Sequence, residues 1–292
     1  MSQIFSGILL NLPMQLKPNH MKKILCPVDF SDVSANGMEY ASHLAKALKA
    51  SLTLLYVRTS IWPEAVLLKQ ESSKSNEEIQ SSLSLFRTEV QNEFGIDCNY
   101  HIATTTDTLE GTVASVAKQY DLVVMGTNGA DNTYQYFFGS NTYQLIEQSD
   151  CPIVVVPQGC TYRPIDLIVY GYDPDTNPIF LIDQLKKLAA PLNSELKVLH
   201  IADDKPSAEV KRRMEILRDA VKVRESGNLT WSFDFQYSGD VWWALDQYMK
   251  NNNASVLALS FHQRSLIEML FSENVIKKVA MVADYPLYVF WK

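Results

Sequence analysis

Short apolar runs alternate with amphipathic stretches along the whole chain. In the first half, five runs have the length and composition of buried strands, at residues 24–28, 52–57, 98–103, 122–125 and 153–156. Helical spacing of apolar positions appears at 33–48 and 77–94, and two more helical patterns follow Asp107, which can cap its helix, and begin at Ser140. Strands alternating with helices predict a parallel, doubly wound α/β sheet with right-handed crossovers.

The second half repeats this order of elements. Its strand-like runs lie at residues 167–172, 196–200, 233–237, 256–259 and 286–290. Asp240 stands before a helical pattern there, as Asp107 does in the first half. The period of about 135–140 residues is far above the periods of solenoid repeats, so it indicates a duplicated domain. We expect a loosely ordered extension over 1–20, a first domain over 21–157, a linker over 158–164 and a second domain over 165–292.

Composition narrows the class of protein. The 292 residues suggest two domains, and 47% hydrophobic with 20% charged residues is ordinary for a globular chain. A net charge of −7 argues against binding to nucleic acid or to an anionic membrane, and we find no apolar run long enough to span a membrane. The four cysteines form neither a CxxC pair nor a metal-binding spacing, which favours a reduced, cytoplasmic protein.

A glycine pattern follows the fourth strand-like run. Gly126 and Gly129 come directly after it, and nine residues later Gly139-Ser140-Asn141 opens a helical pattern. Glycines beyond a strand let backbone amides approach a phosphate without a Cβ in the way, and a helix N-terminus attracts anions. An ordinary connection between a strand and a helix is the alternative interpretation.

Two motifs together indicate a family. The spacing Gly-x2-Gly-x9-Gly-Ser and the opening Ile24-Leu-Cys-Pro-Val-Asp29-Phe-Ser resemble the nucleotide-binding signature of the universal stress protein family. The resemblance covers residues 21–292 as two tandem copies. It implies a Rossmann-like fold in which a nucleotide lies at the carboxyl ends of the first and fourth strands, with ATP or a related nucleotide as the leading ligand. Ten binding positions are implied in the first copy: Pro27, Val28, Asp29, Val57, Met125, Gly126, Gly129, Gly139, Ser140 and Asn141.

The first four of these positions would hold the adenosine part. By similarity, Pro27 and Val28 would line the base pocket, and Val57 would present backbone groups to adenine. Asp29 would approach the adenosine. Ser31 is better placed to cap the following helix, which leaves Asp29 to the ligand.

The remaining positions would hold the ribose and the phosphates. Met125 and Gly126 would flank the ribose, and the glycine loop with Ser140 and Asn141 would hold the phosphates. The polar Asn141 departs from the small apolar residue common in the family. A second departure is the absence of Lys or Arg between residues 118 and 163, so that Mg²⁺, a basic residue from elsewhere or a less charged nucleotide must balance the charge.

The second copy has lost the signature. Ser260 stands where Gly126 does, Gln263 stands where Gly129 does, and Ser-Glu-Asn at 272–274 replaces the Gly-Ser-Asn sequence. Side chains replace the glycines, and Glu273 would repel a phosphate at the helix start. We therefore expect a degenerate, empty second site and a nucleotide in the first copy alone.

The sequence contains no Walker or kinase motif and no recognisable catalytic residue. The resemblance favours a stress-response regulator that binds ATP. A slow ATPase or phosphotransferase using Asp29 and Mg²⁺, and a ligand-free interaction scaffold, are the alternatives. The resemblance also implies pairing through the last strands, as in single-copy relatives that form dimers, and a bare sheet edge is a liability. The strands at 153–156 and 287–290 are therefore expected to pair within the chain as an intramolecular pseudo-dimer. A homodimer and an unidentified protein partner remain open.

Overall fold

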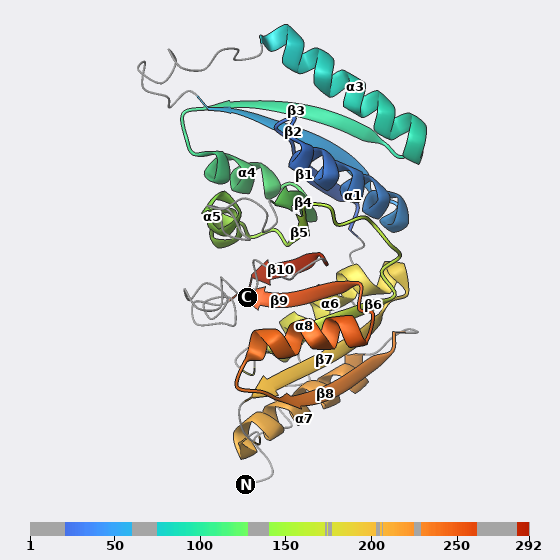
Figure 1. Ribbon diagram of the computed structural model, residues 1–292, viewed down its shortest axis with the longest axis vertical. Coiled ribbons are helices and arrows are strands. Elements are labelled where there is room, and N and C mark those ends of the chain that lie inside the picture. Colours follow the sequence, from blue (N-terminus) through green and yellow to red (C-terminus); the bar gives the residue numbers. More distant parts are fainter. Residues whose placement is uncertain are drawn as a thin grey trace, which may run out of the picture.

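Ten strands of the described residues form one continuous sheet in the order β3-β2-β1-β4-β5-β10-β9-β6-β7-β8 (Figure 1). The computed structural model describes residues 21–59, 75–127, 140–172, 174, 177–202, 205, 207–224, 229–261 and 285–291. The first half of the sheet, β1 to β5, and the second half, β6 to β10, have the same internal order. The α/β prediction of two tandem, doubly wound five-stranded sheets is therefore confirmed.

The first half consists of β1 Lys23–Pro27, α1 Asp32–Leu48, β2 Ser51–Thr59, α3 Asn76–Phe94, β3 Cys98–Thr105, α4 Leu109–Ala117, β4 Leu122–Thr127, α5 Ser140–Gln148 and β5 Ile153–Pro157. Its strands pair in parallel throughout. Helices α1 and α3 pack on one face of the sheet and α4 and α5 on the other, so that both faces are buried.

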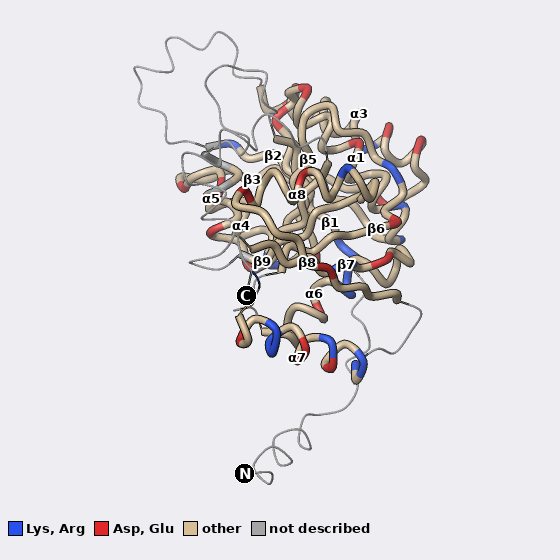
Figure 2. Tube along the Cα trace, turned by 60° about the horizontal axis from the view of Figure 1, so that its bottom comes forward, with Lys and Arg blue, Asp and Glu red and all other residues tan. Residues whose placement is uncertain are grey.

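The second half consists of β6 Leu167–Gly171, α6 Pro178–Leu192, β7 Glu195–Ala202, α7 Ala208–Arg224, β8 Trp231–Tyr237, α8 Val241–Asn251, β9 Val256–Phe261 and β10 Leu287–Trp291. Helices α6 and α7 continue the layer of α1 and α3, while α8 continues that of α4 and α5. Helix α7, in the same layer as α6, carries interspersed acidic and basic residues (Figure 2). No helix of the described residues combines the length and the apolar character needed to cross a membrane.

The two halves meet at a strand pair. β10 runs antiparallel to β5, with Tyr288 opposite Val154 and Leu287 opposite Val155. This is the predicted pairing of the last strands of the two copies, and it makes the chain an intramolecular pseudo-dimer. Each strand would otherwise be the exposed edge of a sheet, so the pairing buries two rows of backbone hydrogen-bonding groups at once.

The helix starts follow the capping rules, with one shift from the prediction. Asp240 caps α8 by accepting a hydrogen bond from the amide of Trp243 at 3.1 Å, as expected. In the first half the cap of α4 is Thr108, whose hydroxyl accepts from Gly111. Asp107 instead accepts from the Thr108 amide at 2.7 Å, because the helix begins one residue later than the pattern indicated.

Candidate functional site

The carboxyl ends of β1, β2 and β4 meet at one edge of the first half. β1 lies between β2 and β4 and is in register with both. The strand order reverses at β1, because β2 and β3 lie on one side of it and β4 and β5 on the other. Pro27 lies opposite Leu55 of β2, and the next amide, that of Val28, donates to Leu55 O at 2.9 Å. The crevice at such a reversal of strand order is where open α/β sheets bind ligands.

Three predicted residues share one face of this edge. Val57 and Met125 are partly buried and pack against the core that α4 and α5 cover. Pro27 is also partly buried. It follows Cys26, whose side chain lies in the core on the opposite face, so alternation along β1 places Pro27 on the face of Val57 and Met125. Val28 differs, because its side chain is 5% exposed and packs in the core under α1. Only the backbone of Val28 is available at the edge.

Asp29 is held in a turn at the start of α1. Its Oδ1 accepts hydrogen bonds from the Ser31 amide at 2.9 Å and from the Ser31 hydroxyl at 2.5 Å. Partial burial raises the pKa of Asp29, but the hydrogen bonds from Ser31 and Ser34 outweigh it, so the pKa lies below its ordinary value. Ser31 caps α1, as predicted. Asp29 is therefore ionised at neutral pH and already oriented by the helix start.

Phe30 gives this turn its shape. It has a φ of 67°, in the left-handed region that residues with a side chain rarely adopt. Its ring packs against Tyr56 at a centroid distance of 5.2 Å and against Phe86 at 5.7 Å. Sequence reasoning missed this positioning role, although an apolar residue between Asp29 and Ser31 in a polar turn was a signal.

Gly126 has a packing role that is independent of any ligand. A Cβ at this position would lie 2.1 Å from the carbonyl oxygen of Val33 in α1. A Cβ at Gly37 would lie 2.4 Å from the amide nitrogen of Gly126. The two glycines therefore let the backbone of α1 touch the end of β4. Gly37 had not been singled out from the sequence.

The structure describes only part of the segment predicted to hold the phosphates. Gly129 and Gly139 fall outside the described residues. α5 begins at Ser140, as predicted, with Asn141 in its first turn. Because β4 and β5 are parallel, this helix start lies at the same edge as the end of β4. The strand and helix that a phosphate-binding loop requires are both present.

Charges near the edge are sparse among the described residues. Arg58, near the end of β2, donates to Asn76 Oδ1 at the start of α3, on the face opposite to Val57. The described part of the chain contains no cluster of three or more His, Cys, Asp or Glu side chains suited to a metal ion. The face formed by Pro27, Val57 and Met125 is therefore apolar, and Asp29 follows Pro27 by two residues.

The equivalent edge of the second half carries a side chain where the first half has Gly126. Ile168 pairs with Val256 as Ile24 pairs with Leu122, which aligns Ser260 with Gly126 as the sequence indicated. The Ser260 hydroxyl lies 2.8 Å from the hydroxyl of buried Tyr170. Helix α6 also begins later after its strand than α1 does. The second half thus holds a side chain where the first half requires glycine.

The two edges differ in exposure as well. Leu259, the equivalent of Met125, is 1% exposed, whereas Met125 is partly exposed. Gly171, the equivalent of Pro27, is buried. Tyr172 packs on the ring of His200, whose Nδ1 lies 3.2 Å from the Tyr172 carbonyl oxygen. The described residues of the second edge thus offer no face comparable to that of the first.

Comparisons with known proteins agree with this architecture. The model of the universal stress protein family matches residues 20–157. The universal stress protein MJ0531 of Methanocaldococcus jannaschii is 30% identical over 159 residues, which cover 51% of this chain and 89% of that protein. The universal stress protein YxiE of Bacillus subtilis is 26% identical over 144 residues, 46% of this chain and 97% of that protein.

A solved structure extends the likeness to both halves. The crystal structure of a universal stress protein from Archaeoglobus fulgidus superposes with a TM-score of 0.69, covering 92% of this chain and 98% of that one. Its sequence identity is 14%, so this likeness shows the fold alone.

Proposed function

This chain belongs to the universal stress protein family, and from that starting point we propose that its first half binds an adenine nucleotide, ATP with Mg²⁺, and acts as a nucleotide-dependent regulator. The observation that carries the proposal is the difference between the two edges. Met125 is partly exposed at the edge where the ionised Asp29 follows β1, while the equivalent Leu259 is buried. The second half would therefore stay empty.

The described residues fit the nucleoside part of the ligand. Pro27, Val57 and Met125 offer an apolar surface of the kind against which an adenine ring packs. The Asp29 carboxylate is a hydrogen-bond acceptor, so it can receive the ribose hydroxyl groups. Its orientation is fixed before the ligand arrives, because Ser31 donates to it twice, which lowers the entropy cost of binding.

The phosphates would be held by main-chain amides. In this proposal Gly129, Gly139, Ser140 and Asn141 surround them, with the N-terminus of α5 pointing at their charge. A helix terminus supplies only about half a unit charge, which does not balance a triphosphate. Mg²⁺ would neutralise the remainder while held mainly by phosphate oxygens and water. Arg58 does not supply this charge in the present arrangement, because it faces α3.

A pair of matched substitutions tests the site. Val57 and Ile201 occupy equivalent positions on β2 and β7, and both are partly buried. Val57→Trp fills the proposed base site, whereas Ile201→Trp makes the same change in the second half. Titration calorimetry with MgATP is expected to show binding that Val57→Trp abolishes and Ile201→Trp preserves. Equal binding in both variants, or loss in Ile201→Trp alone, would contradict the site.

Phosphate release measured on the same samples distinguishes a regulator from a slow ATPase. A regulator is expected to release phosphate no faster than a protein-free control. If release exceeds the control and falls in Asp29→Ala, the chain is an enzyme and the regulatory part of the proposal is wrong.

A further inference from the structure

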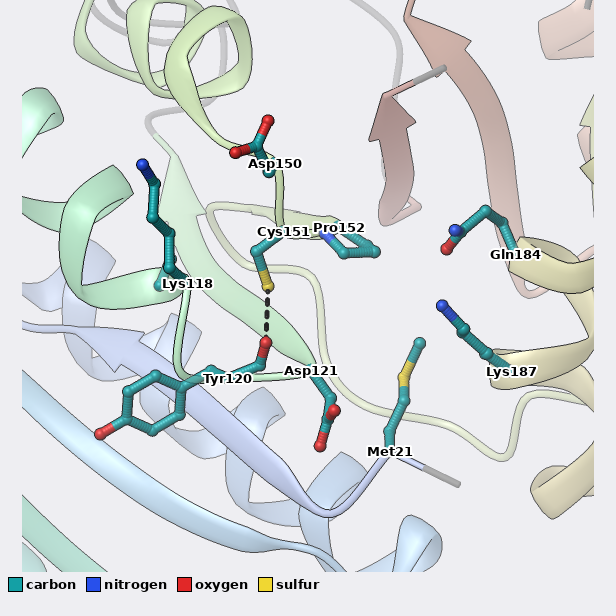
Figure 3. A pocket seen from close by; sticks show the side chains of 10 residues that line it. Met21, Lys118, Tyr120, Asp121, Asp150, Cys151, Pro152, Gln184 and Lys187 are labelled. Carbon is teal, nitrogen blue, oxygen red and sulfur yellow. Dashed lines mark hydrogen bonds between the residues drawn. The ribbon is translucent and has the colours of Figure 1, made fainter. Parts of the chain in front are cut away.

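A cavity of about 350 Å³ lies between the two halves, at the opposite end of the strands from the candidate nucleotide site (Figure 3). Asp121 and Pro152, which precede β4 and β5, and Met21, which precedes β1, line it from the first half. Gln184 and Lys187 of α6 close it from the second half, and their side chains point toward the first half in Figure 3. The cavity is thus built by both copies.

The two halves are related by pseudo-symmetry, so the surface of α1 that is equivalent to the cavity face of α6 shows what can cover such a surface. Helices α1 and α6 end at matching left-handed caps, Lys49 and Asn193. Counted back from these caps, Gln184 and Lys187 of α6 correspond to Tyr40 and His43 of α1. These two residues of α1 are covered by the segment that connects the halves.

The connecting segment is fastened to both halves. The Tyr162 ring stacks on His43 with centroids 5.0 Å apart and an interplanar angle of 3°, and meets Tyr40 edge-on at 5.2 Å. Arg163 donates to the carbonyl oxygen of Asn253 at 3.2 Å and to that of Ala254. Residues 158–164 therefore run across α1 and end against the residues that precede β9.

The same relation assigns an occupant to the cavity. Residues 158–164 precede β6, and the residues that precede β1 at the matching positions are 14–20. We propose that the cavity is the docking site of the chain's own residues 14–20, which would cross α6 as the linker crosses α1. Pro18 corresponds to Tyr162, and Asn19 corresponds to Arg163. This inference is independent of the nucleotide.

The chemistry of the cavity suits this segment. Met21 is 1% exposed, and Asp121 Oδ2 accepts from the amides of Lys22 at 2.8 Å and Lys23 at 3.0 Å, so the chain is already anchored at the entrance. The buried Gln184 Oε1 has no hydrogen-bond partner among the described residues, and a main-chain amide of the segment can donate to it. The Asp150 carboxylate at the rim offers a counter-charge for Lys17.

Cysteine cross-linking in the full-length chain tests the proposal, with Cys151→Ser/Cys160→Ser as the background, because Cys160 is partly exposed and Cys151 lines the cavity, while Cys26 and Cys98 are buried. The double variant Pro18→Cys/Lys187→Cys is treated with bismaleimidoethane and followed by intact mass. His43→Cys/Tyr162→Cys, the equivalent pair whose contact is established, is the positive control. Pro18→Cys/Lys186→Cys is the negative control, because Lys186 points toward α7 and donates to Arg224 O.

Docking raises the effective concentration of the two thiols, so the Pro18→Cys/Lys187→Cys pair is expected to cross-link at least about tenfold faster than the negative control. Leu16→Cys/Gln184→Cys, which corresponds to Cys160 and Tyr40, carries the same expectation and guards against a variant that fails to fold. Rates equal to the negative control in both pairs, while the positive control reacts, would overturn the proposal. So would cross-links formed between chains and not within one.

Discussion

Replacing Gly126 by alanine should destabilise the fold whether or not a nucleotide binds. The added Cβ would lie 2.1 Å from the carbonyl oxygen of Val33 and 2.9 Å from its carbonyl carbon. These atoms belong to the backbone of α1, so no side-chain rotation can relieve the overlap. The helix must move away from β4, and with it Ser31 and the turn that holds Asp29.

The magnitude follows from the kind of atom that is displaced. Inserting a methyl group into a well-packed interior typically costs about 1–3 kcal/mol, and a rigid backbone neighbour favours the upper end, about 3 kcal/mol. Gly111 is a matched control, because its Cβ would meet the side-chain oxygen of Asp107 at 2.9 Å, which can rotate away. It lies in α4, where alanine is preferred over glycine by about 1 kcal/mol, so Gly111→Ala should be neutral or stabilising.

Urea unfolding without nucleotide, followed by circular dichroism, measures both variants. The midpoint of Gly126→Ala is expected to fall with an unchanged slope, and that of Gly111→Ala to stay or rise. A loss below about 0.5 kcal/mol for Gly126→Ala, within the range of an ordinary surface substitution, would refute the packing role. Gly126 would then be a glycine kept for ligand approach.

Four further predictions concern single side chains. Ser31→Ala removes the cap of α1 and should cost about 1 kcal/mol in urea unfolding, and an unchanged midpoint would contradict the cap. The pKa of Asp29 is lowered in the fold, so its stabilising contribution is present above the ordinary value of 3.8 and lost as the pH falls through the folded value. Asp29→Asn should therefore be less stable than the parent at pH 7, and a deficit that persists unchanged at pH 2 would refute this. Tyr170→Phe removes the hydroxyl contact with Ser260 and should cost about 1 kcal/mol, and equal unfolding midpoints would contradict it. Burial raises the pKa of Cys151 to about 12, so its thiol should react with Ellman's reagent at pH 8 only after unfolding, and fast labelling of folded protein would count against this.

The layout of the fold could be predicted because it is encoded locally. Each strand is a short apolar run and each helix an amphipathic one, so the order of elements follows from periodicity. The pairing of β5 with β10 followed from the family resemblance, which implies pairing through the last strands, and from the need to cover the edge strands at 153–156 and 287–290. The order of elements thus uses information within a few neighbouring residues, whereas the strand pairing does not.

The fine structure of the site depends on contacts between distant residues, which periodicity does not report. Gly126 reads as a loop glycine in the sequence, and its packing role emerges only because Gly37, far away in α1, lies against it. Phe30 adopts a positive φ because Tyr56 and Phe86 supply an aromatic pocket. The cap of α4 is Thr108 and not Asp107, since two adjacent capping residues compete and the pattern cannot rank them.

Native mass spectrometry of the full chain titrated with MgATP tests the central claim most directly, because it counts ligands per chain. We predict a single bound nucleotide, lost when Gly129→Val and Gly139→Val are combined, since in the proposed site the amides that hold the phosphates belong to the first copy alone. No adduct, two adducts of similar affinity, or an adduct that survives both substitutions would contradict the account.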